Sequence, residues 1–425
     1  MTSKGVDRNI TLVVGAGAAG LSAAYHLLKA GYNVIVLEAN DYIGGRIKSL
    51  ENDSSHPMEI GASLIHDKTQ ELYAIASRKG MLITRHGKMR FIVNGKFMGV
   101  IKLLFGLRLR DLFKIRKIFN SLYSYDGKDK PLSYLLTLVE VGEIFRKVFS
   151  GVYSASLGTS IENVGVRSLR HSLIGAGLRA EKDIVSIQVK GAFIQLLSEY
   201  VEAVSPCVRL GTVVDSIDYQ SDLVSVTTAS GEVIIANEVV VTVPLSILKG
   251  ESIKFSPPLP ENKQEAIRKL GMGQGAKIAI KFKHKVWKKD CSYIIDCDKN
   301  ITYFIQSPQN DRYVLIAFII GHESCSSNEN MVNSILSDLD AHFHGMASLA
   351  FESAHVQNWS QEKYIAGTYS YDAVHSEGCR EALAESVENK LYFAGEAAVN
   401  GHAATVDGAL ISGKRAAVEI IRKRN

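Results

Sequence analysis

Apolar runs and glycine turns alternate at the start of the chain. An apolar-rich run from Ile10 to Val14 is followed by a glycine turn from Gly15 to Gly20. Residues Leu21 to Lys29 then have helical spacing up to Gly31, and a second apolar run extends from Asn33 to Leu37. Such runs are typical of strands in a parallel sheet that is covered on both faces. The pattern therefore predicts a strand–turn–helix–strand unit.

The pattern changes in the middle of the chain and returns at its end. Between about Gln70 and Gly191, helix-like segments follow a hairpin signal, the Asn94-Gly95 turn within Met89 to Val100. The further elements that the pattern predicts are strands at Thr212 to Tyr219, Val224 to Ala229, Val233 to Ala236, Val239 to Val243, Lys277 to Phe282, Tyr313 to Ile320 and Leu391 to Phe393, and a long helix from Val406 to Arg422.

Composition indicates an ordinary soluble globular protein. Of 425 residues, 46% are apolar and 22% are charged, and the net charge of +5 is small for this length. These values argue against a disordered chain and against a dedicated nucleic-acid binder.

The cysteines favour a reducing compartment. They are scattered, odd in number and without a CxxC pair: Cys207, Cys291, Cys297, Cys325 and Cys379. This argues against a disulfide framework or a zinc site, so no metal is expected and a cytoplasmic location is the simplest interpretation. No secretory signal and no run of 18 apolar residues is visible, so we expect no membrane-spanning helix.

The glycine turn matches the GxGxxG pattern of dinucleotide-binding proteins. Gly15 would make the tight turn, Gly17 would let the backbone approach a pyrophosphate, and Gly20 would let the helix pack closely on the strand. Ala18 and Ala19 open the helix, whose N-terminal N–H groups attract phosphate. The alternative is a glycine turn in an α/β protein without a ligand, which the strand, helix and following acid together disfavour.

The residues after the second strand suggest which dinucleotide is bound. Glu38 would accept hydrogen bonds from ribose hydroxyls and would repel the 2′-phosphate of NADP, but it fits both NAD and FAD. Two further glycine-bearing segments, Ile43 to Arg46 and Glu59 to Ser63, favour a larger, buried cofactor. Arg46 could neutralise a pyrophosphate with two parallel hydrogen bonds. The alternative for Arg46 is a surface arginine after a turn.

Four separated blocks of the sequence resemble the flavin-containing amine oxidases, a family that includes monoamine oxidases, polyamine oxidases and flavin histone demethylases. The blocks run from Val13 to Arg46, from Glu59 to His66 (EIGASLIH), from Ala236 to Phe282, and from Asn358 to Lys414. The third contains VVVTVPLSIL and GMGQGAKIAIKF, and the fourth contains NWSQEKYIAGTYSY, LYFAGEAA and TVDGALISGK. The third and fourth blocks point specifically to amine oxidases, whereas residues 70–190 carry little recognisable signal.

The resemblance implies a set of FAD-binding residues. Glu38 would bind the ribose, Arg46 the pyrophosphate, and Glu396 the ribityl or pyrophosphate region. Val214 would present backbone groups to the adenine, and Val406, at the start of the last helix, would lie near flavin N1 and O2, where a helix N-terminus stabilises negative charge. The other residues assigned to the cofactor by the resemblance are Gly15, Gly17, Ala18, Ala19, Gly20, Ala39, Gly45, Gly61, Ala62, Ser63, Leu64, Gly395 and Thr405, with Gly61 to Leu64 along the isoalloxazine.

Two residues are implied as catalytic. Lys277 matches the lysine that holds a water against flavin N5 in the family, and burial there would lower its pKa. Tyr369 matches one wall of an aromatic cage that orients the amine. The alternatives are a strand lysine that faces solvent and a core tyrosine. Trp359 and Tyr364 are expected to pack near the same site.

The chain departs from the family pattern at several positions. Thr368 stands where monoamine oxidases carry a cysteine bonded covalently to the flavin, so we expect noncovalent FAD. Thr405 stands where many members have the second cage tyrosine, so the cage is expected to be half open. Asn40 replaces an arginine that often follows the ribose-binding acid, which removes one phosphate contact. Arg90 is a weak candidate for binding a substrate carboxylate.

A basic segment from Lys102 to Phe119 has six basic residues and one acid among apolar positions. The favoured interpretation is a substrate-domain helix with one buried and one solvated face, because the apolar positions are dense enough to need protein cover. The alternative is an amphipathic helix that docks on an anionic membrane or partner.

Together these features predict an α/β protein with a Rossmann-like FAD-binding domain and an α+β substrate domain, both discontinuous. The FAD-binding domain would comprise residues 1–69, 191–270 and 385–425, and the substrate domain residues 70–190, mainly helical, and 271–384, mainly sheet. The expected reaction is oxidation of a small-molecule amine to an imine by hydride transfer to flavin N5, with O2 giving hydrogen peroxide. Two alternatives stay open: a flavoenzyme of the same fold that desaturates or cyclises a biosynthetic intermediate, and a non-catalytic FAD-binding scaffold.

Overall fold

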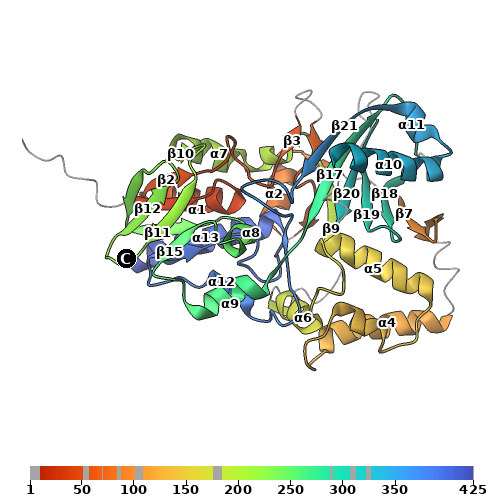
Figure 1. The fold of residues 1–425 in the computed structure, drawn as a ribbon, viewed down its shortest axis with the longest axis horizontal. Coiled ribbons are helices and arrows are strands. Elements are labelled where there is room, and N and C mark those ends of the chain that lie inside the picture. Colours follow the sequence, from red (N-terminus) through yellow and green to blue (C-terminus); the bar gives the residue numbers. More distant parts are fainter. Residues whose placement is uncertain are drawn as a thin grey trace, which may run out of the picture.

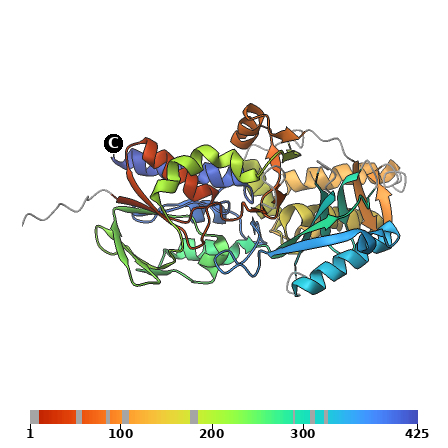
Figure 2. The same cartoon turned by 90° about the horizontal axis from the view of Figure 1, so that it is seen from above.

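A computed structural model describes residues 10–50, 57–68, 70–83, 88–100, 109–175, 184–287, 291–306, 313–321 and 327–424. Within this part of the chain, two sheet-containing regions lie side by side (Figure 1). One contains both ends of the described chain, and the other contains a larger sheet flanked by helices on both sides (Figure 2).

The first region is built on a five-stranded parallel sheet in the order β10-β2-β1-β14-β23. Its strands come from three distant parts of the sequence: β1 (Ile10–Val14), β2 (Asn33–Leu37), β10 (Val208–Arg209), β14 (Glu238–Val241) and β23 (Leu391–Phe393). Successive side chains of a strand point to opposite faces, so Val13 faces one hydrophobic cluster while Leu12 and Val14 face another. The sheet is therefore covered on both faces, as the continuous apolar runs predicted.

Two long helices cover one face of this sheet. Helix α1 (Ala18–Lys29) packs along α13 (Val406–Arg424), so the first helix and the last lie together (Figure 1). The same side carries α2 (Glu71–Arg78), η3 (Phe193–Leu197) and α7 (Ser198–Val204), and α7 continues into η4 (Ser205–Cys207).

A second, four-stranded sheet and three short helices cover the other face. The sheet has the order β13-β12-β11-β15, from β11 (Val214–Asp218), β12 (Val224–Thr228), β13 (Val233–Ala236) and β15 (Lys254–Ser256). The helices are α8 (Leu245–Lys249), α9 (Glu261–Lys269) and α12 (Cys379–Ala384). Cys379 and Leu383 of α12 thus belong to the hydrophobic cluster beneath β1 and β14, although residues up to 384 were expected in the substrate domain.

The second region is built on a seven-stranded sheet in the order β21-β17-β20-β19-β18-β7-β8. Its strands are β7 (Lys88–Val93), β8 (Lys96–Gly99), β17 (Gly275–Phe282), β18 (Cys291–Asp296), β19 (Ile301–Ile305), β20 (Tyr313–Ile320) and β21 (Phe351–Asn358). The hairpin β7–β8 comes from the first intervening segment and pairs with β18. Helices α10 (Asn328–Phe343) and α11 (Met346–Ala350) cover one face, which includes Ile278 and Ile280. Residues of the alternating set, such as Lys277 and Ala279, lie on the opposite face.

Smaller elements connect the two regions. They are β3 (Ser49–Leu50), β4 (Met58–Glu59), β5 (Ile65–Asp67), β6 (Leu82–Ile83), β9 (Ile184–Val189), β16 (Gly271–Met272) and β22 (Ser370–Tyr371). β9 pairs with both β5 and β6, and β16 pairs with β22.

A group of helices lies below the large sheet in Figure 1. It contains α4 (Leu109–Ser124), η1 (Leu132–Leu136), α5 (Glu143–Leu157) and α6 (Val166–Gly175). In the basic segment, the described helix α4 buries Ile118 and Leu122, while Arg116 and Lys117 are exposed and Phe113 is 76% exposed. Residues 102–108 of that segment lie outside the described part. The helix thus has one buried face, as favoured above, and its contact with a membrane stays untested.

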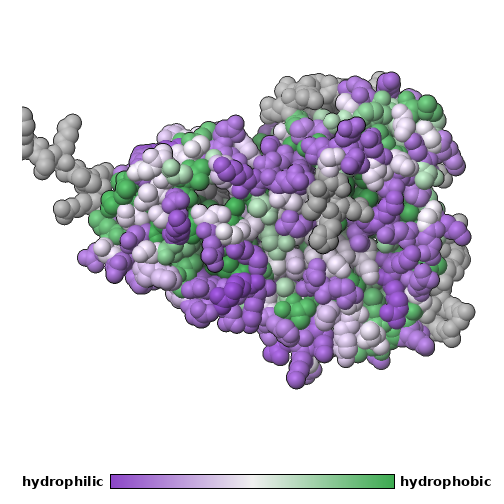
Figure 3. All heavy atoms as spheres, viewed as in Figure 1, coloured by the Kyte–Doolittle hydropathy of each residue, from purple (hydrophilic) through white to green (hydrophobic). Residues whose placement is uncertain are grey.

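On the face drawn in Figure 3, hydrophobic residues are scattered among hydrophilic ones and form no broad apolar band. Among the residues described, no helix combines the length and the apolar character needed to cross a membrane. The thiols of Cys207, Cys297 and Cys379 are free, and Cys325 lies outside the described residues.

Candidate active site

The predicted glycine turn lies at the end of β1, where the chain enters α1. Gly15 has φ +107°, a conformation that favours glycine, and a Cβ on Gly20 would lie 1.9 Å from the Gly15 carbonyl oxygen. The helix begins at Ala18, so Ala18 and Ala19 are its first residues and their N–H groups face the turn side. Gly17 pairs with Gly44 of the next glycine segment. The backbone is therefore arranged for close approach of a phosphate.

Glu38 is buried at the carboxyl end of β2. One carboxylate oxygen accepts a hydrogen bond of 2.6 Å from Ala16 N, and the other accepts bonds of 2.9 Å from Asn40 N and Nδ2. Asn40, expected only to lack a phosphate contact, thus holds the acid in place. Because the oxygen bonded to Ala16 N accepts only that one bond, Glu38 can still accept a ribose hydroxyl there.

The segment just before β11 contacts the backbone of Glu38 and Asn40. Thr212 N donates to the Glu38 carbonyl, and Gly211 N donates to the Asn40 carbonyl. This brings Val214, buried at the start of β11, into the neighbourhood of the acid. Ala39, which links Glu38 to Asn40, is partly buried there. The residues predicted for the adenosine end are therefore close together in space.

Arg46 and Glu396 form an ion pair between segments 350 positions apart. Arg46 Nη1 donates to Glu396 Oε1 at 2.8 Å and to the Thr368 carbonyl at 2.7 Å. Glu396 also accepts bonds from Ser370 N and Oγ and from Ala404 N. Burial raises the pKa of Glu396, but Arg46 and Ser370 outweigh it, so the pKa of this carboxyl lies below its usual range. The Glu396 carboxyl is therefore ionised at neutral pH.

These two residues border a cleft at the carboxyl ends of β14 and β23. Gly395, with φ +145°, and Val241 line it as well. Ligands of open α/β sheets bind at this end of the strands. The cleft therefore continues the path that starts at the glycine turn.

The loop from Gly61 to Leu64 lies against the backbone of Arg46. A Cβ on Gly61 would be 2.2 Å from the Arg46 carbonyl oxygen, and Ala62 N donates to that oxygen at 3.0 Å. Trp359 is buried behind the loop and donates from Nε1 to the Ile60 carbonyl at 2.8 Å. This agrees with the expected packing role of Trp359 near the site.

Lys277 reaches this loop from β17. Its Nζ donates to the Gly61 carbonyl at 2.5 Å and to Ser63 Oγ at 3.1 Å. Burial lowers its pKa to about 8, and the nearby Glu59 carboxylate opposes that shift. The structure thus excludes the alternative of a lysine that simply faces solvent.

Aromatic side chains surround the space beside Lys277. The Lys277 ammonium lies 5.6 Å from the centroid of the Phe304 ring, and Phe304 makes an edge contact with Tyr293 at 4.8 Å. Phe318 is the cross-strand partner of Lys277, and its ring centroid lies 6.3 Å from that of Tyr369. Burial raises the pKa of Tyr369, whose hydroxyl donates to the Ala155 carbonyl at 3.3 Å. An aromatic enclosure thus links the predicted lysine to the predicted tyrosine.

The start of α13 is capped by Thr405. Its hydroxyl accepts a bond of 2.9 Å from Gly408 N and donates to the His402 carbonyl at 2.6 Å. Thr405 is therefore a helix cap here, and Val406 is the first helical residue, as predicted.

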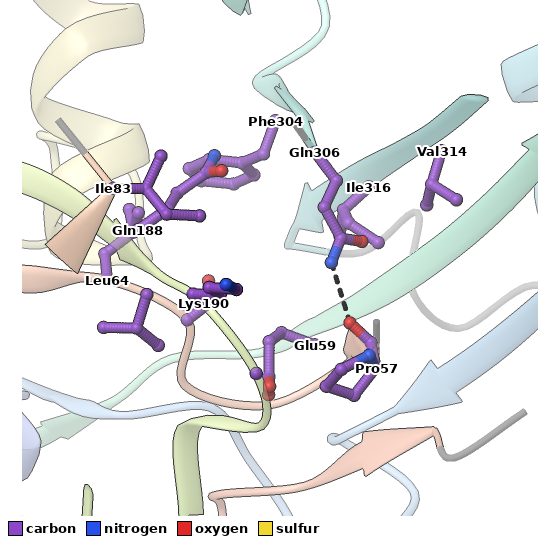
Figure 4. A pocket seen from close by; sticks show the side chains of 13 residues that line it. Pro57, Glu59, Leu64, Ile83, Gln188, Lys190, Phe304, Gln306, Val314 and Ile316 are labelled. Atoms are coloured by element: carbon purple, nitrogen blue, oxygen red, sulfur yellow. Dashed lines mark hydrogen bonds between the residues drawn. The ribbon is translucent and has the colours of Figure 1, made fainter. Parts of the chain in front are cut away.

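A cavity opens in front of the Gly61 to Leu64 loop. Its lining includes Pro57, Glu59, Ser63, Leu64, Ile83, Gln188, Val189, Lys190, Gly191, Phe304, Gln306, Val314 and Ile316. Leu64 and Ile83 lie on one side and Gln306 and Ile316 on the other (Figure 4). Gln306 Nε2 donates to the Pro57 carbonyl at 2.7 Å (Figure 4). The cavity is mostly apolar with a few polar groups, as small-molecule sites usually are.

Sequence reasoning missed several residues of this site. Glu59, Tyr293, Phe304 and Phe318 received no role, although Glu59 stood in a quoted block. Strand alternation from Lys277 could have suggested that its neighbours on β19 and β20 share its face, but strand pairing was not deducible. Arg90 is not among the cavity-lining residues and lies across Gly99 of the hairpin. The carboxylate contact of Arg90 stays a prediction.

A family model for flavin-containing amine oxidoreductases matches residues 18–421. The chain belongs to this family. "Lysine-specific histone demethylase 1 homolog 1" of Arabidopsis thaliana is 30% identical over 98% of this chain and 53% of its own length. "Polyamine oxidase 3" of Oryza sativa subsp. japonica is 28% identical over 96% of this chain and 88% of its own length. The chain spans 30 to 58% of the length of the demethylase relatives that it matches.

The fold is also that of solved amine oxidase structures. Cyclohexylamine oxidase from Brevibacterium oxydans IH-35A superimposes with a TM-score of 0.80 at 20% identity, covering 98% of this chain and 99% of that one. This confirms the predicted fold class, and the family match confirms the predicted resemblance.

Family membership implies a flavin cofactor, and the described residues fit one. Within the described part of the chain, a Cβ on Gly17 would have only the Gly44 carbonyl oxygen as a neighbour, at 4.0 Å, so the turn has open space for a phosphate that a side chain would fill. The Thr368 hydroxyl is buried and has no hydrogen-bond partner among the described residues, so a polar group of a ligand can satisfy it.

Proposed function

We propose that this protein oxidises a small-molecule amine to an imine with noncovalently bound FAD. When bound, FAD accepts a hydride at N5 from the carbon next to the amine nitrogen, and O2 then reoxidises it to give hydrogen peroxide. The observation that carries the proposal is the position of Lys277, which is partly buried, donates to the Gly61 to Leu64 loop and lies against the Phe304 ring.

Different residues of the chain would bind different parts of the cofactor. Glu38 and the backbone near Val214 would hold the adenosine end, and the N-terminus of α1 with Arg46 the pyrophosphate. The loop from Gly61 to Leu64 would support the isoalloxazine. The start of α13 at Val406 would favour negative charge on the flavin ring.

The aromatic enclosure would select and orient the amine. Tyr369 and Phe318 form one ring pair of this enclosure, and Phe304 and Tyr293 form a second. Aromatic faces attract ammonium groups and bind alkyl groups, and a dry enclosure disfavours bulk water. Lys277 would hold a water or a proton at the edge of the site. Polyamine oxidases among the relatives support an alkyl amine as the substrate class.

An amine screen tests the proposal most directly. The FAD-loaded protein would be mixed anaerobically with monoamines, diamines, polyamines and amino acids, and the flavin absorption band would be followed. At least one amine should bleach the band, and air should restore it with release of hydrogen peroxide. Bleaching by a non-amine only would favour a desaturating or cyclising flavoenzyme. No bleaching by any substrate would leave FAD as a structural ligand of a scaffold.

A further inference from the structure

Glu59 is a buried carboxyl to which the proposed reaction gives no role. It lies on β4, two residues before the loop that would support the flavin, and 8% of its surface is exposed. Ser49 Oγ lies 2.9 Å from both carboxylate oxygens, and Phe193 N donates to one of them at 2.8 Å. It also borders the cavity. A buried carboxyl with these hydrogen bonds beside the candidate active site either stabilises the local structure or acts on the charge of a neighbouring group.

The loop connects Glu59 to Lys277. Glu59 precedes Ile60 and Gly61, and the Lys277 ammonium donates to the Gly61 carbonyl and to Ser63 Oγ. The two groups also influence each other's charge. Burial raises the pKa of Glu59 to about 7, opposed by Phe193 N, Ser49 and Lys277, and burial lowers the pKa of Lys277 to about 8, opposed by Glu59. Near neutral pH both groups are close to the point of changing charge.

Other ionisable groups around the pair are placed differently. Lys190 is exposed at the border of the cavity, and the Lys48 ammonium lies 4.8 Å from the ring centroid of Tyr42. Burial raises the pKa of Tyr293 to about 12, so this phenol stays neutral. Among the described residues, Glu59 is therefore the anion that acts on Lys277.

We propose that Glu59 is a positioning residue that keeps Lys277 protonated where its ammonium donates to Gly61 and Ser63, and so sets the number of protons held beside the cavity. This rests on the proposed function only in taking Lys277 as part of the active site. A protonated amine donates three hydrogen bonds and accepts none. Two of these go to Gly61 and Ser63, which leaves one donor for a water or a ligand in the site. A neutral amine would instead offer a lone pair, so Glu59 decides whether Lys277 donates or accepts.

A purely structural role is the competing explanation. Glu59 bridges β3, β4 and the N-terminus of η3, and its loss would weaken those contacts whatever the charge of Lys277. The two roles differ in pH dependence. A structural bridge affects stability, whereas an electrostatic partner moves the pH at which Lys277 titrates.

The test is a pH titration of the FAD-loaded, substrate-free protein, followed by its flavin absorption spectrum from about pH 5 to about pH 10. The wild type should show two transitions that belong to the coupled pair. In Glu59→Gln the lower transition should disappear, and the upper one should move to lower pH, since Lys277 loses its anion and about tenfold of its proton affinity. In Lys277→Met the upper transition should disappear, and the lower one should move to higher pH.

Two further variants keep the test decisive if Glu59→Gln folds poorly. Ser49→Ala removes a donor from the carboxylate, so the lower transition should move to higher pH while the upper stays in place. Lys281 lies on the same strand as Lys277 and pairs with Glu352 at the surface. Glu352→Gln removes that exposed partner and should change neither transition. Unchanged transitions in Glu59→Gln, with only lower stability, would overturn the proposal. Because no substrate is present, failure to oxidise amines does not affect the result.

A readout without flavin separates this inference from cofactor binding. Labelling of Lys277 by a small amine-reactive ester, quantified by mass spectrometry across the same pH range, reports its neutral fraction directly. Glu59→Gln should become reactive at lower pH than the wild type. Identical labelling profiles would contradict the proposal even if FAD does not bind.

Discussion

Lys277 and Lys281 lie four residues apart on β17, yet their surroundings differ. The Lys281 ammonium pairs with Glu352 at the surface, with a side chain that is 36% exposed. Lys277 is enclosed by the Gly61 to Leu64 loop and by Phe304. The same residue type on the same face of a strand therefore has two different environments, and the difference comes from elements distant in sequence.

Replacing Lys277 by methionine should preserve the fold and FAD binding but slow flavin reduction or reoxidation by about 10- to 1,000-fold, because the site loses its proton-holding group. Stopped-flow absorption would measure each half-reaction separately. Lys281→Met is the matched control and should leave both rates unchanged. Wild-type rates for Lys277→Met in both half-reactions would remove Lys277 from the mechanism.

Thr368 decides how the flavin is attached in our proposal. Its hydroxyl cannot form the thioether that a cysteine forms at this place, so FAD should be released when the protein is denatured with acid. The released flavin would be measured by absorption in the supernatant and identified by chromatography. Flavin that stays with the precipitated protein would show a covalent bond elsewhere and would contradict the noncovalent assignment.

Single-residue predictions from the sequence differed in quality for a physical reason. Positions whose role comes from the backbone, such as Gly15 and Gly20, were predictable because the local turn sets their conformation. The position of Lys277 was predictable only through the resemblance. Glu59 and Tyr293 could not be predicted, because their neighbours come from strands whose pairing the sequence does not reveal.

At the scale of elements, α12 is joined to the cofactor region by one buried arginine. Arg380 donates to Asp372 at 2.6 Å, to Ser370 Oγ at 2.8 Å and to the Ala397 carbonyl at 3.2 Å. Ser370 in turn donates to Glu396. The arginine is 2% exposed and thus orders the acid that holds Arg46.

Replacing Arg380 by methionine should lower the free energy of unfolding by about 3 to 5 kcal/mol, since it leaves the buried Asp372 carboxylate without its charged partner. Weaker FAD retention should accompany this, because Ser370 and Glu396 lose support. Chemical denaturation and equilibrium dialysis would measure the two effects. Arg268→Met, which removes an exposed pair with Glu261, should cost less than about 1 kcal/mol. Equal losses in the two variants would argue against a special role for Arg380.

A buried lysine binds the carbonyl groups at the C-terminal end of α12. Lys263 Nζ donates to the carbonyls of Ala382, Leu383 and Glu385 at 2.7 to 2.9 Å. Burial lowers its pKa to about 7, despite the attraction of Glu385. Lysine in the unfolded chain has a pKa of about 10.4, so the unfolded state binds more protons between these two values.

The free energy of unfolding should therefore rise with pH between about 7 and 10 in the wild type relative to Lys263→Met. The variant should also be less stable at every pH, by about 1 to 3 kcal/mol for each carbonyl that stays without a donor. Urea denaturation of both proteins over this pH range would measure the difference. A pH-independent difference would show that Lys263 titrates as it does in water.

Element boundaries were predictable where the pattern is local. The strands Tyr313–Ile320 and Leu391–Phe393 and the start of the helix at Val406 match the expected residues. The placement of α12 was not deducible, because a six-residue helix packs where its apolar residues find cover, and this partner, α9, is distant in sequence.

At the scale of the whole molecule, the proposed cofactor would unite segments from both ends of the chain. The adenosine end would lie at Glu38 and Val214, and the flavin end at the Gly61 to Leu64 loop and Lys277. The first helix and the last helix, α1 and α13, would present their N-termini to it. A ligand that contacts so many separate segments stabilises the folded state in proportion to the logarithm of its concentration over its Kd.

This arrangement predicts a difference between whole FAD and its flavin half. At a concentration about 100 times its Kd, FAD should stabilise the apoprotein by about 2.7 kcal/mol and raise its Tm. FMN at the same concentration should raise the Tm less, because it leaves Glu38 and the Val214 region without a ligand. Glu38→Gln should weaken FAD binding but leave the smaller effect of FMN unchanged. Thermal unfolding with each ligand measures all of these effects. Equal stabilisation by FAD and FMN would mean that the adenosine half makes no net contribution, and the glycine turn with Glu38 would then lose its assigned role.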